Sequence, residues 1–398
     1  MRSAKHFVLI LSFLSFADSA LYGEESGTDQ LVISIGLDAL PKLNQQFKKQ
    51  FTVLSKTQDL AFLKIASKEL PRLSQLMHSL YGRCGGYVVE NSVEEAIRDF
   101  EDIIPAPFLS PRIHHQDLVK KALALVDENN IRASIEALSS YRNRYYMSTT
   151  GVHSQEWVGA KWQELASALP NVELQYFEHA DYPQRSVILT VTGTKKPNEI
   201  VIVGGHGDSI AGWNQPDDME APGADDNASG IATLTEALRV LGALGIAPDR
   251  TLKFISYAAE EVGLRGSKDI AESFRARNEN VVGVVQLDMT NFTKRPNEII
   301  LMTDHTNASQ NGFMKNLFQS YLPNFIIRED RCGYACSDHA SWHRNGYPVS
   351  FPFETRMHDY NKTIHSAQDT IAVSENNALH SVPYAQILIS YLLELGLL

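Results

Sequence analysis

Three nearly continuous apolar runs in the second half of the chain constrain the fold most. They are EIVIVGGH (199–206), TLKFISYAAEE (251–261) and VVGVVQLDM (281–289). Runs of this kind are typical of strands that are buried on both faces of a parallel sheet. A helical pattern at 228–245 separates the first two runs. The alternation predicts a three-layer α/β/α domain with a central mixed, mostly parallel sheet.

Each of these runs leads into side chains that can bind a metal ion or carry a proton. His206 ends the first run, Glu260 and Glu261 end the second, and Asp288 lies near the end of the third. Because open α/β sheets place their ligand crevice at the carboxyl ends of the strands, we expect these residues to meet at one edge. From an extended strand end, the two adjacent glutamates cannot point the same way. One of them could bind metal while the other acts as a general base toward water.

Further ligands reach the same edge from other segments. Asp225 and Asp226 come from the entry to the helix at 228–245, and IHSAQDT (364–370) could supply His365. Histidine and carboxylate ligands together suit a divalent metal such as zinc. A single zinc would need only three protein ligands. Five candidates, with one aspartate bridging, fit two ions about 3.5–4 Å apart.

The N-terminal third has a different composition. A short basic start, the apolar run FVLILSFLSFA (7–17) and the small residues near Ala20 predict a signal peptide at 1–20 and a secreted protein. A membrane anchor, the alternative, would need roughly 20 apolar residues. Residues 21–105 contain apolar positions at helical spacing over 60–80, and the proline cluster at 103–112 marks a boundary. We therefore predict a helical pro-segment at 21–105 that is removed, and a catalytic domain at 106–398. A permanent small N-terminal domain is the alternative.

The charge limits which partners the protein can bind, and the cysteine spacing predicts a disulfide. The formal net charge is -11 and no basic block occurs, so nucleic acid is a poor candidate partner. No segment after the signal peptide is expected to span a membrane. Cys332 and Cys336 stand four residues apart, and in an exported protein we expect them to form a disulfide. Zinc binding by this pair would need two further ligands.

Two other functional classes, serine hydrolases and non-catalytic binding proteins, have weaker support in the sequence. GDSIA (207–211) approaches the G-x-S-x-G motif of serine hydrolases, but Ala211 replaces the final glycine. Ser337, Asp338 and His339 are consecutive, so their side chains diverge and cannot form a triad. A non-catalytic binding protein on the same fold would be expected to lack ligands or the base, and none is missing here.

Six sequence blocks together resemble the secreted bacterial leucyl aminopeptidase family, the co-catalytic di-zinc exopeptidases. The blocks are HGDS, APGADDNASG, YAAEEVGLRGS, QLDMTN, CGYACSDHASW and IHSAQDT, and the likeness runs from about residue 110 to the end. The resemblance implies two Zn²⁺ per chain, with Asp226 as the bridging ligand. One ion would be held by Asp226, Glu261 and His365, and the other by Asp226, His206 and Asp288. Glu260 matches the general base.

The resemblance also implies how the substrate is bound. Asp208 corresponds to a carboxylate that orients a ligand imidazole. An apolar pocket for the first side chain of the substrate would use Met289, Met302, Tyr334, the Cys332–Cys336 bridge, Phe353, Tyr360 and Ile364. This sequence has Met357 where relatives carry an aromatic residue, and Gly207 where they carry a bulkier one. We expect a monomeric enzyme that removes apolar, leucine-like residues from peptides with a free N-terminus.

Overall fold

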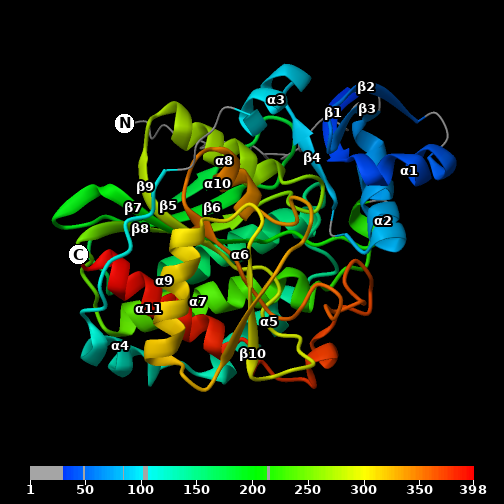
Figure 1. Cartoon of the computed structure of the whole chain (residues 1–398). Helices are drawn as coiled ribbons and strands as arrows, with labels where there is room; N and C mark the ends of the chain where they lie inside the picture. The colour runs from blue at the N-terminus through cyan, green and yellow to red at the C-terminus, as the bar shows by residue number, and fades with distance from the viewer. Residues whose placement is uncertain (1–29, 48–49, 84, 102–105, 213–215) are drawn as a thin grey trace, which may run out of the picture.

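A computed structural model describes residues 30–47, 50–83, 85–101, 106–212 and 216–398 of the chain. The predicted signal peptide at 1–20 lies outside these residues. Two parts are visible: a small N-terminal part, blue to cyan in Figure 1, and a larger part that contains the catalytic domain predicted at 106–398 and is called the catalytic part for that reason. Among the described residues, no helix combines the length and the apolar character that crossing a bilayer requires.

The catalytic part is built on a mixed six-stranded sheet. Its order is β12 (Val349–Ser350), β9 (Asn280–Gln286), β7 (Lys196–His206), β8 (Arg250–Tyr257), β6 (Ser186–Val191) and β5 (Val172–Phe177). The pairs β12–β9, β9–β7 and β7–β8 are parallel, and the pairs that involve β6 are antiparallel. Beside it lies a three-stranded sheet of β11 (Ile326–Asp330), β10 (Glu298–Met302) and β13 (Pro352–Phe353).

Helices cover both faces of the large sheet, as Figure 1 shows. On one side lie α4 (Gln116–Leu123), α5 (Glu128–Ser139), α6 (Thr149–Leu165), α7 (Gly230–Ala243), α9 (Ala308–Tyr321) and α11 (Val382–Gly396). On the other side lie α8 (Arg265–Ala276) and α10 (His339–Arg344). Alternate residues of β7 face opposite sides of the sheet. Val201 and Val203 pack in the core under α4, α5, α6, α7, α9 and α11. Ile200 and Ile202 pack in the core under α8 and α10. The predicted three-layer fold is confirmed.

One strand is more deeply buried than its sequence indicates. Alternation of apolar and polar residues predicts a wet face for the strand around 185–193, yet every residue of β6 is buried. The polar side chains on this face have protein partners. Ser186 Oγ accepts from the backbone N of Ala258, and Thr190 Oγ1 accepts from Lys253 Nζ. The neighbouring strand β8, together with the residue that follows it, therefore satisfies these groups.

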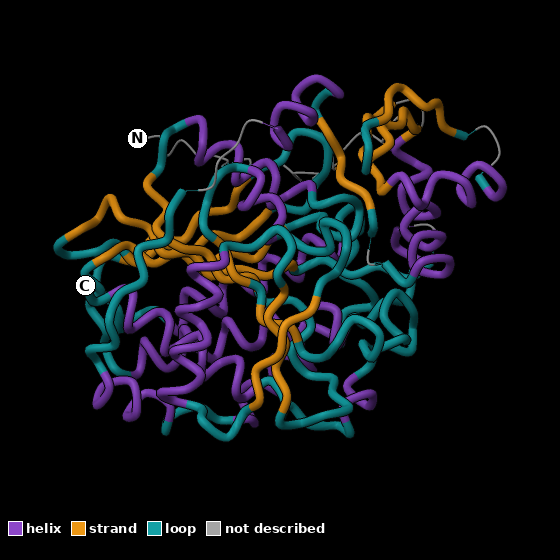
Figure 2. Tube along the Cα trace, in the orientation of Figure 1, coloured by secondary structure: helices purple, strands orange, loops and turns teal. Residues whose placement is uncertain are grey.

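The N-terminal part is not the helical segment that the sequence predicts. Its elements are β1 (Gln30–Gly36), α1 (Leu40–Gln46), β2 (Phe51–Lys56), β3 (Leu60–Ala66), α2 (Leu70–Tyr81), β4 (Tyr87–Glu90) and α3 (Val93–Glu101). The strands form an antiparallel sheet of order β2-β3-β1-β4, visible as the small separate sheet in Figure 2. Within 60–80, helical spacing holds only from Leu70, where Pro71 occupies the first turn. Residues 60–66 pair instead as the central strand β3.

Candidate metal centre

The predicted ligands meet at the carboxyl edge of the parallel strands. His206 is the last residue of β7, Glu261 follows β8 by four residues, and Asp288 follows β9 by two. Asp226 lies in the turn before α7, and His365 in the turn between β13 and α11. The sequence places these residues up to 159 positions apart, and the shared strand direction brings them together.

Two groups of three residues have ligand atoms within 4.8 Å of one another, and both contain Asp226. In the first, His206 Nε2 lies 3.1 Å from Asp226 Oδ1 and 3.4 Å from Asp288 Oδ1. In the second, His365 Nε2 lies 3.3 Å from Asp226 Oδ2 and 2.7 Å from Glu261 Oε2. Each oxygen of Asp226 therefore faces a different group. This is the arrangement a carboxylate needs to bridge two ions.

The donor set fits divalent cations. His206 Nε2 and Asp288 Oδ1 are buried and have no hydrogen-bond partner among the described residues. Burial of polar atoms without partners is costly, and a cation would complete their coordination. Imidazole nitrogen and carboxylate oxygen are both ligands that zinc accepts.

The carboxylates make the surroundings strongly negative. Burial lowers the pKa of His206, but Asp288 and Glu260 outweigh burial and raise it well above its usual value. Burial likewise opposes the charged form of His365, yet Glu261 and Asp226 raise the pKa of His365 to about 10. Such an excess of negative charge favours cations at this edge of the sheet.

Asp208 connects the candidate ligands with the candidate base. Its two carboxylate oxygens accept from the backbone N atoms of Glu260 and Glu261, at 3.0 and 3.2 Å. One of these oxygens also lies 3.5 Å from His206 Nδ1. The His206 Nδ1 atom lies closer to the Asp208 backbone carbonyl, at 3.2 Å, so orientation of the imidazole by the Asp208 carboxylate stays a prediction. The contacts with the glutamate backbone are additional, and they fix the turn after β8 against the end of β7.

Glu260 lies beside the ligands without belonging to either group. Its Oε2 atom is buried and has no hydrogen-bond partner among the described residues. Burial raises the pKa of Glu260 well above its usual value, against the opposing charge of His206. Glu261 and Asp338 act in the same direction as burial. A carboxylate with these properties is suited to accept a proton near neutral pH.

The two adjacent aspartates have separate surroundings. Asp226 faces both ligand groups, whereas Asp225 accepts from the backbone N of Phe292 at 3.2 Å and from Asn361 Nδ2 at 3.1 Å. Asp369 accepts from the backbone N atoms of both aspartates. Sequence reasoning missed Asp369, although it lies in the same IHSAQDT block as His365.

Three residues at this edge have a strained backbone. Ala259, Met289 and His365 have φ angles of 55°, 57° and 57°, which lie in the left-handed region that residues with a side chain seldom adopt. Each of them is a candidate ligand or an immediate neighbour of one or of Glu260. Strained residues of this kind cluster at active sites, where the surrounding structure holds them in place.

An apolar pocket opens beside the ligands. It is lined by Gly82, Asp288, Met289, Cys332, Tyr334, Cys336, Phe351, Phe353, Met357, Tyr360 and Ile364. Most of the predicted pocket residues are therefore present. Met302 is an exception, because it is fully buried behind the pocket wall within the same apolar cluster. Phe351 was missed, although it stands two residues before Phe353 in an extended segment.

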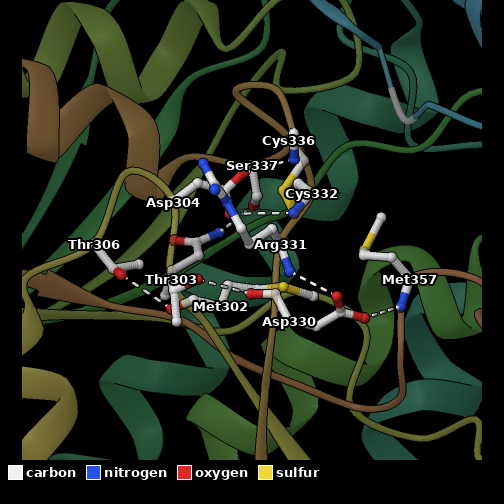
Figure 3. The surroundings of a disulfide bond; sticks show 12 residues. Met302, Thr303, Asp304, Thr306, Asp330, Arg331, Cys332, Cys336, Ser337 and Met357 are labelled. Atoms are coloured by element: carbon white, nitrogen blue, oxygen red, sulfur yellow. Dashed lines mark hydrogen bonds between the residues drawn. A yellow bond between two sulfur atoms is a disulfide. The ribbon is translucent and has the colours of Figure 1, made fainter.

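The predicted disulfide shapes one wall of the pocket. Cys332 and Cys336 are bonded, with their Cα atoms 6.1 Å apart. Figure 3 shows how the neighbouring turn is held: Asp304 accepts from the backbone N of Cys332, and Asp330 accepts from that of Met357. Met357 is thus fixed through its backbone, while its side chain lines the pocket.

The structure accounts for Gly207. A Cβ atom at this position would lie 2.6 Å from Gln155 Nε2 and 2.6 Å from Ser256 Oγ. Gln155, from α6, accepts from Ser256 Oγ at 2.8 Å and donates to the Tyr257 carbonyl at 3.2 Å. The volume that a bulkier residue would occupy is therefore filled by a side chain from a neighbouring helix.

The N-terminal part reaches this site, which sequence reasoning did not foresee. The His78 ring of α2 packs against the His365 ring with centroids 4.9 Å apart. Ser74 Oγ donates to the Glu261 carbonyl at 2.8 Å. Tyr360 Oη donates to the Gly82 carbonyl at 3.1 Å. No periodicity or motif in 21–105 signals these contacts.

The serine-hydrolase alternative has no support in the geometry. Ser209 is buried, and its hydroxyl donates to the Ala221 carbonyl and accepts from the backbone N of Arg144. Its hydroxyl therefore links two loops. Ser337 Oγ accepts from Gln286 Nε2 inside the protein.

Comparison with known proteins identifies the family. The sequence model of peptidase family M28 matches residues 186–389. The chain belongs to peptidase family M28. A probable aminopeptidase of Saccharomyces cerevisiae is 34% identical over 75% of this M28 peptidase and 81% of its own length. A probable leucine aminopeptidase of Arthroderma benhamiae is 38% identical over 81% of this chain and 85% of its own length.

Solved structures agree with this assignment. The crystal structure of LapB from Legionella pneumophila covers 93% of this M28 peptidase and 100% of its own chain, with a TM-score of 0.81 and 26% identity. The family and its aminopeptidase relatives confirm the prediction of a metallo-aminopeptidase that hydrolyses peptide bonds. Fungal and bacterial proteins both appear among the relatives, so the comparisons support the M28 family as a whole and not a bacterial secreted group.

Proposed function

We propose that this M28 peptidase is a two-zinc aminopeptidase that removes apolar N-terminal residues from peptides. The observation that carries the proposal is the pair of ligand groups that share Asp226, each facing one of its oxygens, next to Glu260. His206, Asp226 and Asp288 would hold one zinc ion, and Asp226, Glu261 and His365 the other. Zinc supplies Lewis-acid polarisation of a carbonyl and makes water more acidic.

The chain's own residues perform the proton transfers. Glu260 takes a proton from the attacking water on its buried carboxylate as the C–O bond forms. It then gives this proton to the amine nitrogen as the peptide C–N bond breaks. Asp208 fixes the backbone of Glu260 and the imidazole of His206, so base and ligand keep their relative positions.

The apolar pocket supports a preference for apolar first residues. Its walls are aromatic, aliphatic and sulfur-containing side chains, and the candidate ligand Asp288 also lines it. Met357 gives one wall an unbranched, adaptable side chain, so we expect longer aliphatic residues such as methionine to be accepted beside leucine. Tyr334 lines the pocket, and we propose that its hydroxyl contacts the substrate carbonyl.

We further propose that residues 21–105 act as an inhibitory pro-segment while they are docked. With Gly82 against it, the apolar pocket has a volume of about 20 Å³. That volume holds about one water molecule and excludes a leucine side chain. A cleft of about 1090 Å³ lies between the N-terminal part and the turn at 331–335, and Tyr334 lines both spaces. Access from the cleft to the pocket requires the segment around Gly82 to move.

Removal and permanent attachment of this segment predict different mature proteins. N-terminal sequencing of the secreted enzyme decides between them: a start near residue 106 supports removal, and a start near Leu21 supports a permanent domain. Export itself is proposed from the signal-like start and the disulfide.

Zinc analysis combined with a panel of aminoacyl-nitroanilides tests the activity. We expect two zinc ions per chain, loss of turnover with a chelator, recovery on zinc addition, and highest kcat/KM for leucine and methionine substrates. Full turnover in metal-free protein would refute the metal mechanism. Equal turnover of leucine and aspartate substrates would refute the apolar pocket as the specificity site.

A further inference from the structure

Arg144 is a wholly buried arginine at the junction of two loops that carry candidate ligands. Its Nε atom donates to the Gly207 carbonyl at 2.9 Å, directly after His206. Its Nη2 atom donates to the Gly223 carbonyl at 2.8 Å, three residues before Asp226. One guanidinium therefore ties both loops together.

Other contacts of this arginine strengthen the link. Nη1 donates to the Pro222 carbonyl and, at 3.3 Å, to the Leu138 carbonyl. Its backbone N donates to Ser209 Oγ, which in turn donates to the Ala221 carbonyl. Side chain and backbone thus connect residues 207–209 with residues 221–223 at several points.

The chemistry of these contacts requires an arginine. The acceptors of the side chain are four backbone carbonyls, and a guanidinium presents several N–H groups in a fixed fork. A lysine at this position could not reach all of them in the same geometry. Burial lowers the pKa of Arg144 to about 10, and the negative charges of Asp369, Asp208 and Asp226 oppose burial only in part.

We propose that Arg144 is a positioning residue that sets the spacing between His206 and Asp226, the two residues that would share a zinc ion. The inference depends on the proposed zinc site. Residues that hold metal ligands in place typically change metal affinity or activity by about 10–100-fold when they are replaced. Arg144 acts on both loops through backbone carbonyls and touches no ligand side chain in the contacts described above.

Zinc affinity of Arg144→Lys, measured by chelator competition with zinc alone, tests the proposal. We expect the affinity to fall by about 10–100-fold, and turnover to recover when zinc is added in excess. In Arg144→Ala, we expect added guanidinium, but not urea at the same concentration, to restore part of the zinc affinity.

The matched control is Arg250→Lys. Arg250 also donates to a backbone carbonyl, that of Leu395, but at the opposite end of the sheet. This control should lower thermal stability and leave zinc affinity unchanged.

Several outcomes would overturn the inference. Zinc affinity of Arg144→Lys within twofold of the original chain, with a loss of stability like that of Arg250→Lys, would show that the role is only structural. If Arg144→Lys does not fold, Ser209→Ala takes its place, because it cuts the backbone part of the same link; unchanged zinc affinity there also rejects the inference. Failure of the original chain to bind zinc would reject the proposed function itself, which is a separate result.

Discussion

The catalytic part and the N-terminal part have cores of different kinds. Helices cover both faces of the six-stranded sheet, and each face has its own apolar core. The four-stranded sheet of the N-terminal part completes its core with side chains of the catalytic part, among them Tyr145, Tyr146 and Tyr182. The catalytic part thus has two complete cores of its own. The core of the N-terminal part is complete only when side chains of the catalytic part pack against it.

The two parts also contribute differently to the candidate metal centre. Every candidate ligand, and Glu260, lies between His206 and His365 in the catalytic part. The N-terminal part adds contacts that cover the site, through Ser74, His78 and Gly82. All candidate ligands thus lie in one part, and under the proposed inhibition the other part would control access to them. Variants in the two parts should therefore have opposite effects on turnover.

The largest effect is expected at the bridging ligand of the catalytic part. Asp226→Ala removes a carboxylate that both ligand groups share, so zinc should fall from two ions per chain to none and turnover below detection. Asp288→Ala affects one group only, and should leave one zinc. Metal analysis of both purified variants measures the difference. Equal zinc content in the two variants would contradict the bridge.

Replacement of the base should separate chemistry from metal binding. Glu260→Gln keeps the shape of the side chain but cannot accept the proton, so kcat should fall by about 10²–10⁴-fold while both zinc ions stay bound. The control is Glu329→Gln on the exposed surface of β11, which should leave turnover unchanged. Retained turnover in Glu260→Gln would remove this residue as the base.

Weakened docking of the N-terminal part should raise turnover. Glu90 forms a buried ion pair with Arg344 of the catalytic part, with both oxygens near 3.0–3.1 Å from Nη2. Removal of one member of such a pair costs about 3–5 kcal/mol. Glu90→Ala in the intact chain should therefore loosen docking and increase hydrolysis of leucyl-nitroanilide. Glu329→Ala breaks an exposed pair with Lys315 and should change stability by no more than about 1 kcal/mol. Lower turnover in a folded Glu90→Ala protein would argue against inhibition.

A smaller effect should show how tightly the catalytic part is packed beside His206. Gly207→Ala places a methyl group against Gln155 and Ser256, and overpacking of this kind costs about 1–3 kcal/mol. Chemical denaturation measures the loss, and Gln155→Ala in the same chain should recover part of it. Gly312→Ala is the control, since a Cβ atom there has no neighbour within 4 Å. Full stability of Gly207→Ala would show that the neighbours adapt.

The most gradual effect is a dependence of stability on pH in the catalytic part. Burial lowers the pKa of His380 from 6.5 to about 4. Below pH 6.5 the unfolded chain binds a proton there that the folded chain does not, so stability falls as the pH drops from 6.5 to 4. One such group contributes at most about 1.4 kcal/mol per pH unit. His380→Gln should reduce this slope in denaturation curves, and an unchanged slope would reject the assignment.

The sequence predicted the structure of the catalytic part better than that of the N-terminal part. In the catalytic part, long apolar runs that end in His206, Glu261 and Asp288 predicted both the sheet and the edge where the ligands meet. Pairing among parallel buried strands leaves a clear signal because few polar residues are tolerated there. In the N-terminal part, β3 was expected to be helical. A short strand whose side chains contact another part of the chain has no period of its own that local sequence could reveal.

The sequence by itself determined the fold class of the catalytic part, the residues of the candidate metal centre and the disulfide, because these depend on the chemistry at strand ends and on local spacing along the chain. Only the tertiary structure decided that Gln155 fills the space beside Gly207, that Arg144 joins two loops, that Met302 stands behind the pocket wall, and that α2 covers the site. These contacts join segments far apart in the chain. Their energies depend on which surfaces meet after the layers have packed, and no local pattern encodes that choice.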